Sequence, residues 1–224
     1  MKTMLVLSMG ALLLAGTLSA QTPVPEWQAG VDKMKSLIQT NPAQASEEVG
    51  ELLKGKNKKN VDLVTSVAHV YLDAGKLTEA QEYLAMAKKA NNKDPKVSVL
   101  EGDIALAQKN VGQACQLYEQ AIYFDPNCKD AYLKYAQAYK SASPALAIEK
   151  LEQLKAVDPN CLEADRELAE VYYSSNSFGK AAEMYAKFID TPLATEDDML
   201  KYAFALFLNP VSYTHLTLPT NSLV

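Results

Sequence analysis

Residues 61–95 read VDLVTSVAHVYLDAGKLTEAQEYLAMAKKANNKDP and contain two helical patterns in succession. In the first pattern, apolar and small residues recur at spacings of three and four: Val64, Val67, Ala68 and Tyr71. This spacing predicts a helix over about residues 61–74 with one face turned to a core. Gly75 follows at once, and glycine commonly stands just past the end of a helix.

The second pattern predicts another helix, over about residues 78–89. It brings Ala80, Leu84 and Ala87 to one side of that helix. Asp94-Pro95 then closes the unit, because proline lacks an amide hydrogen and its ring clashes with the preceding turn. The stretch therefore predicts a helix-turn-helix unit.

The same unit recurs along the chain. Asp-Pro pairs recur at Asp94-Pro95, Asp125-Pro126 and Asp158-Pro159, and Thr191-Pro192 continues the series. These prolines are 31, 33 and 33 residues apart, and a period near 34 is typical of stacked helix pairs. We predict four repeats, over about residues 61–94, 95–127, 128–159 and 160–193.

Small residues recur in register on the two helices of each unit. The pairs are Ala68 with Ala80, Gly102 with Ala114, Ala136 with Ala147, and Ala169 with Ala181. Two helices approach to about 8–10 Å only where side chains permit it. Larger residues beside them are expected to fill the remaining space: Tyr71, Tyr139 and Tyr172 on first helices, with Leu84, Tyr118, Leu151 and Tyr185 on second helices.

This combination of small, aromatic and closing proline positions resembles the tetratricopeptide repeat family over roughly residues 61–192. The resemblance implies an all-α fold, a right-handed α-solenoid of stacked antiparallel helix pairs. Three positions depart from the family pattern. Ser98 and Asp165 stand where a large residue is expected, and Lys109 stands where a turn glycine is usual.

The flanking segments continue the array. Residues 26–39 and 43–53 predict one more helix pair, so we interpret residues 21–60 as a degenerate N-terminal repeat or cap, in which Trp27 packs and binds no ligand. Residues 195–209 predict the first helix of a truncated fifth repeat. The lysines at 54, 56, 58 and 59 are expected in a solvated loop between helices.

Residues 1–20 have the pattern of a secretory signal peptide, with Lys2 before an apolar run and Ala20 at the expected cleavage site. The run is shorter than the about 20 residues that span a bilayer, so no stable membrane span is expected. An uncleaved anchor is the alternative. We predict an exported protein, in the periplasm of a Gram-negative bacterium.

Residues 210–224 differ from the rest of the chain. No charged residue occurs from Val211 onward, and helical periodicity ends. The stretch 211–220 resembles a translated sequencing adapter, so we treat the tail as non-native; a genuine neutral tail is the alternative. An alanine twelve residues after Ala203 would continue the repeat, but that position holds His215.

The sequence contains no pattern typical of an enzyme. His69 is the only histidine besides His215, and phosphate-binding, hydrolase and zinc-protease motifs are missing. Glu196, Asp197 and Asp198 are interpreted as ordinary first-turn residues of a helix, since acidic groups favour the positive end of the helix dipole. We expect no catalytic residues, no metal and no cofactor.

The cysteines and the overall charge bear on two further points, disulfide bonding and nucleic-acid binding. Cys115, Cys128 and Cys161 are expected to be free or buried thiols, because three cysteines cannot all pair within the chain. Cys128 and Cys161 stand at equivalent positions of stacked repeats, which lie farther apart than the about 7 Å that a disulfide bridges. The net charge is -5 and the chain has no long basic run, so we expect no nucleic-acid partner.

The resemblance implies that the first helices line a concave groove that takes an extended peptide or a helix of a partner. Carried over by register, the groove residues are Thr65, His69, Leu72, Val99, Asp103, Leu106, Leu133, Gln137, Lys140, Arg166, Glu170 and Tyr173. The lysine and asparagine clamp for a terminal carboxylate that some members carry is missing at the first of these positions. For His69, the alternative is a half-exposed residue without a special role.

We therefore predict an interaction scaffold or adaptor of the cell envelope whose partner is a protein or peptide. The alternative is a sensing or docking region of a longer protein, with a catalytic or membrane domain outside this sequence. Carbohydrate binding is a third hypothesis, which the tyrosines support little because most stand at predicted core positions.

Overall fold

A computed structural model describes residues 24–209, which form eleven α-helices, one 3-10 helix and no strand. The helices are α1 (Gln28–Leu37), α2 (Pro42–Leu52), η1 (Gly55–Lys59), α3 (Val61–Asp73), α4 (Leu77–Asn91), α5 (Pro95–Ala107), α6 (Val111–Phe124), α7 (Lys129–Tyr139), α8 (Pro144–Val157), α9 (Leu162–Ser174), α10 (Phe178–Tyr185) and α11 (Glu196–Leu208). The predicted signal peptide and the adapter-like tail lie outside the described residues.

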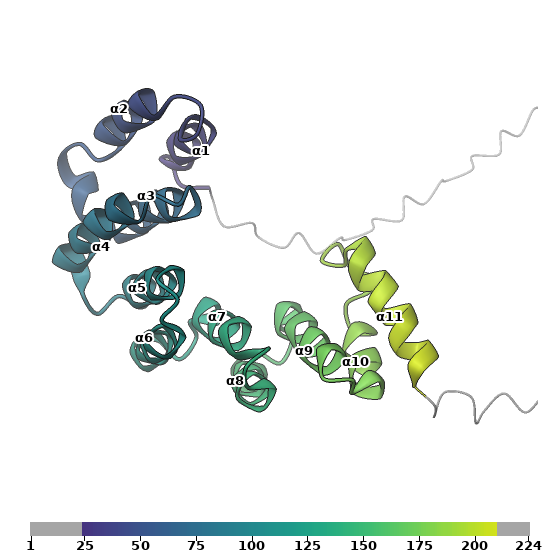
Figure 1. Ribbon diagram of the computed structural model, residues 1–224. Coiled ribbons are helices and arrows are strands. Elements are labelled where there is room, and N and C mark those ends of the chain that lie inside the picture. The colour runs from purple at the N-terminus through teal and green to yellow at the C-terminus, as the bar shows by residue number, and fades with distance from the viewer. Residues whose placement is uncertain (1–23, 210–224) are drawn as a thin grey trace, which may run out of the picture.

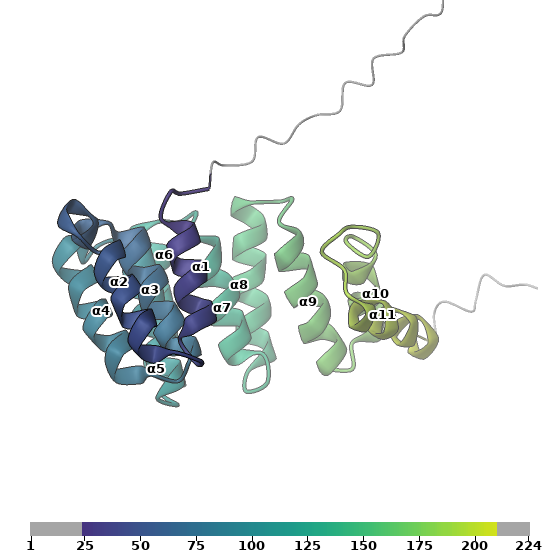
Figure 2. The ribbon, with the colours of Figure 1, turned by 90° about the horizontal axis from the view of Figure 1, so that it is seen from above.

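The helices form a curved array of antiparallel pairs (Figure 1). The first helices α3, α5, α7 and α9 line the inner side of the curve, while α4, α6 and α8 lie on its outer side. Seen from above, α8, α9, α10 and α11 follow one another in chain order towards the far end of the array (Figure 2). The predicted all-α solenoid is therefore confirmed.

Polar caps and turns define where the helices begin and end. The Asn60 side chain accepts a hydrogen bond from the Leu63 amide, and Asn110 accepts one from Gln113. Thr195 and Asp198 form a reciprocal capping box at the start of α11. Lys109, which stands where a turn glycine is usual, has a φ of 64°, close to the 73° of Gly75. The turn conformation is thus kept without the glycine.

Small residues let the helices of each pair approach closely. Ala68, Ala80, Ala136 and Ala147 are all fully buried, as the sequence predicted. In the pair α5 and α6, the ring of Tyr118 lies directly over Gly102. Burying a large apolar side chain of this kind stabilises a fold by roughly 1.5–3 kcal/mol.

The core is a chain of clusters that follow the array. One cluster extends over α1–α5, the next over α5–α7, a third chiefly over α7–α9, and the last over α9–α11. Trp27 packs against the first cluster, as predicted for the cap. Each cluster joins neighbouring helices only, which is the organisation of a solenoid.

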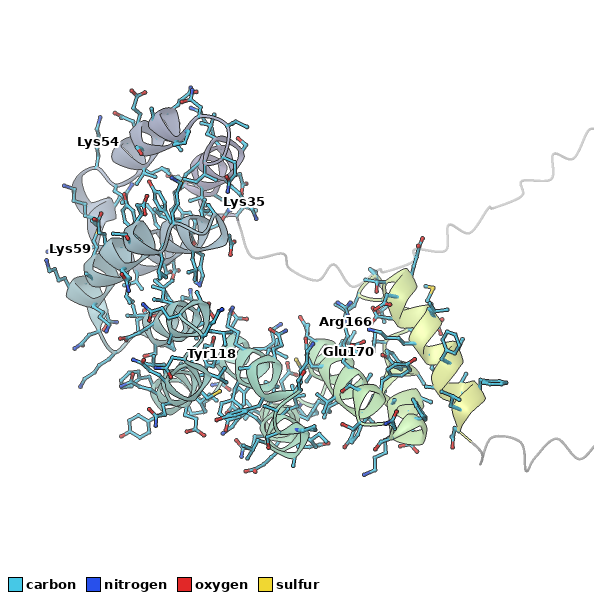
Figure 3. The ribbon with its side chains drawn as sticks, viewed as in Figure 1. Lys35, Lys54, Lys59, Tyr118, Arg166 and Glu170 are labelled. Atoms are coloured by element: carbon cyan, nitrogen blue, oxygen red, sulfur yellow. The ribbon has the colours of Figure 1, made fainter. Side chains whose placement is uncertain are left out.

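Two further sequence predictions concern thiols and lysines. Cys115, Cys128 and Cys161 are free, as predicted. The lysine-rich stretch after α2 is exposed but forms the short helix η1 instead of an irregular loop, and Lys54 and Lys59 extend away from the array (Figure 3).

Within residues 24–209, no helix is long and apolar enough to cross a membrane.

Candidate partner-binding groove

Charged residues connect consecutive first helices along the inner side. Asp62 of α3 pairs with Lys96 of α5 at 2.6 Å, and Lys129 of α7 pairs with Glu163 of α9 at 2.7 Å. Both pairs are 34 residues apart in sequence. Stacking the repeats therefore brings oppositely charged residues of successive units together. We call this series of contacts the inner ladder.

Asp103 of α5 is a buried member of the inner ladder. Its Oδ2 lies 2.9 Å from Nε2 of His69 and 3.0 Å from Nζ of Lys134, while its Oδ1 accepts a 2.8 Å hydrogen bond from the Tyr118 hydroxyl. These partners come from α3, α7 and α6. The carboxylate thus connects three successive repeats.

These contacts shift the pKa values of the cluster. Burial alone would raise the pKa of Asp103, but the hydrogen bond from His69, the charge of Lys134 and the Tyr118 hydroxyl together hold it below its ordinary value. Burial and the neighbouring Asp103 charge raise the pKa of Tyr118. Asp103 is therefore ionised and Tyr118 neutral at pH 7, which makes the hydroxyl the donor.

The inner ladder continues between α9 and α11. Arg166 binds Asp198 through two nitrogens, at 3.2 Å and 3.0 Å. Glu170 accepts hydrogen bonds from Lys201, at 2.9 Å and 3.0 Å, and from the Tyr185 hydroxyl at 2.9 Å. Figure 3 shows Arg166 and Glu170 on α9. Hydrogen bonds from Thr195 and Arg166 outweigh burial and lower the pKa of Asp198.

A hollow of about 340 Å³ opens at the N-terminal end of the inner side. Residues before and within α3, α5 and α7 line it, together with the start of the cap: Pro25, Trp27, Asp62, Thr65, Ser66, His69, Lys96, Val99, Cys128, Asp130 and Lys134. Thr65 and Val99 are buried, whereas Asp62, Lys96 and Asp130 are exposed. The hollow therefore combines apolar side chains, such as Trp27 and Val99, with the buried Thr65 and with a charged rim of both signs.

The twelve predicted groove residues fall into four groups in the structure. Thr65, His69 and Val99 line the hollow. Asp103, Gln137, Arg166 and Glu170 form hydrogen bonds to side chains of neighbouring helices, Gln137 through Glu167 Oε1 at 2.7 Å. Leu72, Leu133 and Tyr173 pack against core clusters. Leu106 is 37% exposed, and Lys140 is half-buried at the C-terminal end of α7.

The sequence reasoning missed several residues that line the hollow. Lys96, Lys134 and Asp62 were not predicted, and Trp27 contributes to the hollow as well as to the cap. The sequence did contain a signal for the contact between Asp62 and Lys96, because these residues carry opposite charges at equivalent positions of two successive repeats. Opposite charges one repeat apart indicate a contact between repeats.

The described part of the chain offers no cluster of three or more His, Cys, Asp or Glu side chains arranged to hold a metal ion. His69 and Asp103 form a close pair, but Lys134 and Tyr118 share the same carboxylate. The pair therefore joins helices within a larger polar network.

Curved stacks of helix pairs with an inner groove define the class of α-solenoid proteins. The sequence profile described as tetratricopeptide repeat matches residues 68–129 and 137–194, together more than half of the chain. The chain belongs to the tetratricopeptide repeat family. No curated protein sequence matches it.

Solved structures with the same fold cover most of this chain. A thermophilic tetratricopeptide repeat protein of Thermus thermophilus is 19% identical, with a TM-score of 0.62 over 80% of this chain and 98% of that one. PilW, a type IV pilus biogenesis factor, is also 19% identical, with a TM-score of 0.62 over 83% and 88% of the two chains. Pseudomonas aeruginosa PilF is 18% identical, with a TM-score of 0.61 over 81% and 83%. At these identities the likeness concerns the fold.

Proposed function

We propose that this protein is an exported interaction scaffold that holds a peptide or helix of a partner protein on its concave side. The hollow beside α3, α5 and α7 is the observation that carries the proposal, because it combines apolar side chains with charged groups at the rim. Apolar side chains in a hollow anchor a side chain of the partner, and polar groups around them fix its orientation. Membership of the tetratricopeptide repeat family supports a protein partner.

The proposed location is the periplasm. The secretory pattern of residues 1–20 supports export. PilW, a protein of similar fold, is a type IV pilus biogenesis factor, and a role in assembly at the cell envelope agrees with this location. Fractionation of a Gram-negative host that expresses the full chain tests it. Retention in the cytoplasmic fraction would contradict it.

Site-specific cross-linking tests the groove. A photoreactive residue at Ser66, which lines the hollow, is expected to capture the partner in the source organism. The same residue at Tyr123, which is 82% exposed on the outer helix α6, serves as the control and should capture none. Equal capture at both positions, or none at Ser66, would contradict the proposed groove.

Charge reversal then tests whether the rim contributes. Asp130 is exposed at the rim, so Asp130→Lys should reduce capture at Ser66 by about tenfold, the effect of roughly 1.4 kcal/mol. Asp190→Lys, at an exposed turn after α10, is the matched control and should leave capture unchanged. Unchanged capture by the Asp130 variant would show that the rim does not contact the partner.

A second proposal is that these repeats are the sensing or docking region of a longer protein. The uncharged stretch 211–224, with His215 where the repeat register requires a small residue, favours it. Reading the gene past the codon for Asn209 tests the proposal. A membrane segment or an enzyme motif downstream would support it, whereas a stop codon soon after Asn209 would contradict it.

A further inference from the structure

Lysines are concentrated at one corner of the array, where η1 meets α4. Four of the six residues 54–59 are lysine, and so are three of the six residues 88–93. All seven of these lysines are exposed, and neither segment contains an acidic residue. We call the two segments together the basic corner.

The fold brings these two segments of the sequence together. The short helix η1 directly precedes α3 and contacts α4. Because α4 runs antiparallel to α3, its last turn, which carries Lys88 and Lys89, lies beside the start of α3 (Figure 1). Lys59 extends from the same outer side of the array (Figure 3). Two short runs of lysine thus form one surface.

Most lysines of the basic corner have no counter-charge within the protein. Lys54 pairs with Glu51 and Lys88 with Glu101, each at 2.5 Å. Within residues 24–209, the other five form no ion pair with a carboxylate: Lys56, Lys58, Lys59, Lys89 and Lys93. The inner ladder, in contrast, binds its lysines to carboxylates of neighbouring helices. The uncompensated charge of the basic corner is therefore available to an external anion.

Charge is distributed unevenly over the molecule. The net charge of the sequence is -5 and the basic corner contributes seven positive charges, so the remaining residues carry a net charge of -12 (-5 - 7). An anionic surface attracts the basic corner and repels the rest of the molecule. Such a surface would therefore bind the protein in one orientation.

The composition of the basic corner distinguishes among anionic surfaces. Protein interfaces are depleted in lysine and have an apolar centre, but in the described part of the chain no large exposed apolar residue lies between Val24 and Leu106. Nucleic acids are bound with arginine on base edges or with aromatic rings stacked on bases, and the basic corner contains neither. Exposed, flexible lysines attract an anionic lipid surface without a defined docking geometry.

We propose that the basic corner binds the anionic headgroups of a lipid bilayer, so that the protein lies peripherally on a membrane. Each lysine near such a bilayer adds to the attraction, which salt weakens by screening. None of the seven lysines lines the hollow on the inner side, so the bilayer and the partner use different surfaces. The choice of a membrane over a nucleic acid rests also on the proposed export.

Partition into lipid vesicles tests the proposal. The full chain should bind vesicles of phosphatidylcholine with about one-third phosphatidylglycerol at least roughly tenfold more strongly than vesicles of phosphatidylcholine alone, and should lose this preference at about 0.5 M salt. Binding through the apolar residues 1–20 is common to both lipid compositions, so the ratio of the two partition coefficients reports on the lysines. A ratio near one at low salt would overturn the proposal.

Charge reversal locates the binding surface. Lys56→Glu combined with Lys59→Glu should bring the ratio close to one without changing the melting temperature, because neither side chain has an ion-pair partner within residues 24–209. Lys35→Glu combined with Lys109→Glu makes the same change in net charge at two other exposed positions and should keep most of the preference. In Figure 3, Lys35 lies away from Lys54 and Lys59. Equal losses in the two double variants would overturn the proposal, since binding would then depend on net charge alone.

Soluble polyanions separate lipid from the other anionic partners. At the protein concentration that half-saturates the anionic vesicles, neither duplex DNA nor poly-L-glutamate should be bound, because the lysines of one corner neutralise few charges on an otherwise acidic molecule. Tighter binding of either polymer than of the vesicles would overturn the proposal, in favour of a nucleic acid or an acidic protein respectively. Fractionation tests export separately, so retention in the cytoplasm would contradict the proposed location while leaving the vesicle ratio unchanged.

Discussion

Asp103 joins more elements than any other charged side chain of the inner ladder. A buried carboxylate without partners would be costly, so its contacts with His69, Tyr118 and Lys134 are needed to keep it ionised. His69 thereby has a structural role as a bridge between α3 and α5. The His69 side chain is 35% exposed, as the alternative in the sequence analysis expected, and a contact between His69 and a partner stays a prediction.

Asp103→Asn is expected to destabilise the protein by roughly 1.5–3 kcal/mol at pH 7, the usual effect of removing hydrogen bonds to a charged group. Because the folded-state pKa of Asp103 is lowered, its contribution is fully present above the ordinary value of 3.8 and is lost as the pH falls through the lower folded-state pKa. Thermal melts of both proteins between about pH 7 and pH 2.5 test this. A difference in stability that stays constant to the lowest pH would contradict it.

The sequence could place His69 and Asp103 on the same face but could not predict their contact. Both were assigned to the groove by register, and they are one repeat of 34 residues apart. What register alone does not reveal is whether two such side chains bind each other or a partner. That depends on the spacing and tilt between successive helices, which side chains from α6 and α7 also determine.

At the scale of helix pairs, Gly102 decides how closely α5 and α6 approach. A β-carbon added at Gly102 would lie 2.5 Å from Cε1 of Tyr118. Tyr118 cannot move aside easily, because it is fully buried and its hydroxyl is bound to Asp103. The close approach of the two helices therefore depends on the missing side chain.

Gly102→Ala is expected to lower the free energy of unfolding by about 1–3 kcal/mol, the usual effect of overpacking a core. The matched control is Gly50→Ala in α2, where an added β-carbon meets no atom within 4 Å. That change should raise stability by about 0.5–1 kcal/mol, since alanine is the better helix former. Urea denaturation of both variants checks the opposite signs. A neutral Gly102 variant would show that α6 can move outward freely.

The sequence predicted the bounds of the first helix closely. It did not predict the surroundings of two residues that depart from the family pattern. The first helix of the opening stretch was predicted over residues 61–74 and is Val61–Asp73. Ser98 and Asp165, which replace large residues, are both 2% exposed. Lys155 and Lys187 bind Asp165 at 2.8 Å and 3.3 Å. Those cations come from α8 and the segment after α10, so the pattern of α9 alone could not predict them.

At the scale of the whole molecule, stability is distributed along the array. Each core cluster joins neighbouring helices, and no cluster extends from the cap to α11 within residues 24–209. A solenoid of this kind transmits a local defect mainly to the adjacent units. The two ends of the array can therefore differ in their free energy of local unfolding.

Leu151→Ala is expected to test this distribution. Leu151 is fully buried in the cluster chiefly of α7–α9, and its truncation should cost about 2–5 kcal/mol. Amide hydrogen exchange should accelerate most in α7–α10 and least in α3 and α4. Uniform acceleration from α1 to α11 would indicate that the array unfolds as one cooperative unit.

The overall architecture could be predicted from the sequence because it depends on a repeated local pattern, whereas the groove could be predicted only in part. Register identified Thr65, His69 and Val99 of the hollow but missed Trp27, which approaches from the cap. Trp27 directly precedes α1, and α1 packs against α3. No periodic pattern specifies this packing, because the cap is not a regular copy of the repeat.

The inner ladder also has a genetic consequence. Arrays of equal units can lengthen or shorten when recombination adds or removes one whole copy. Here, loss of the second unit would set Asp62 opposite Asp130 in place of Lys96, and His69 opposite Gln137 in place of Asp103. The units share a fold but are not interchangeable, so the order of copies in the gene is itself constrained by charge.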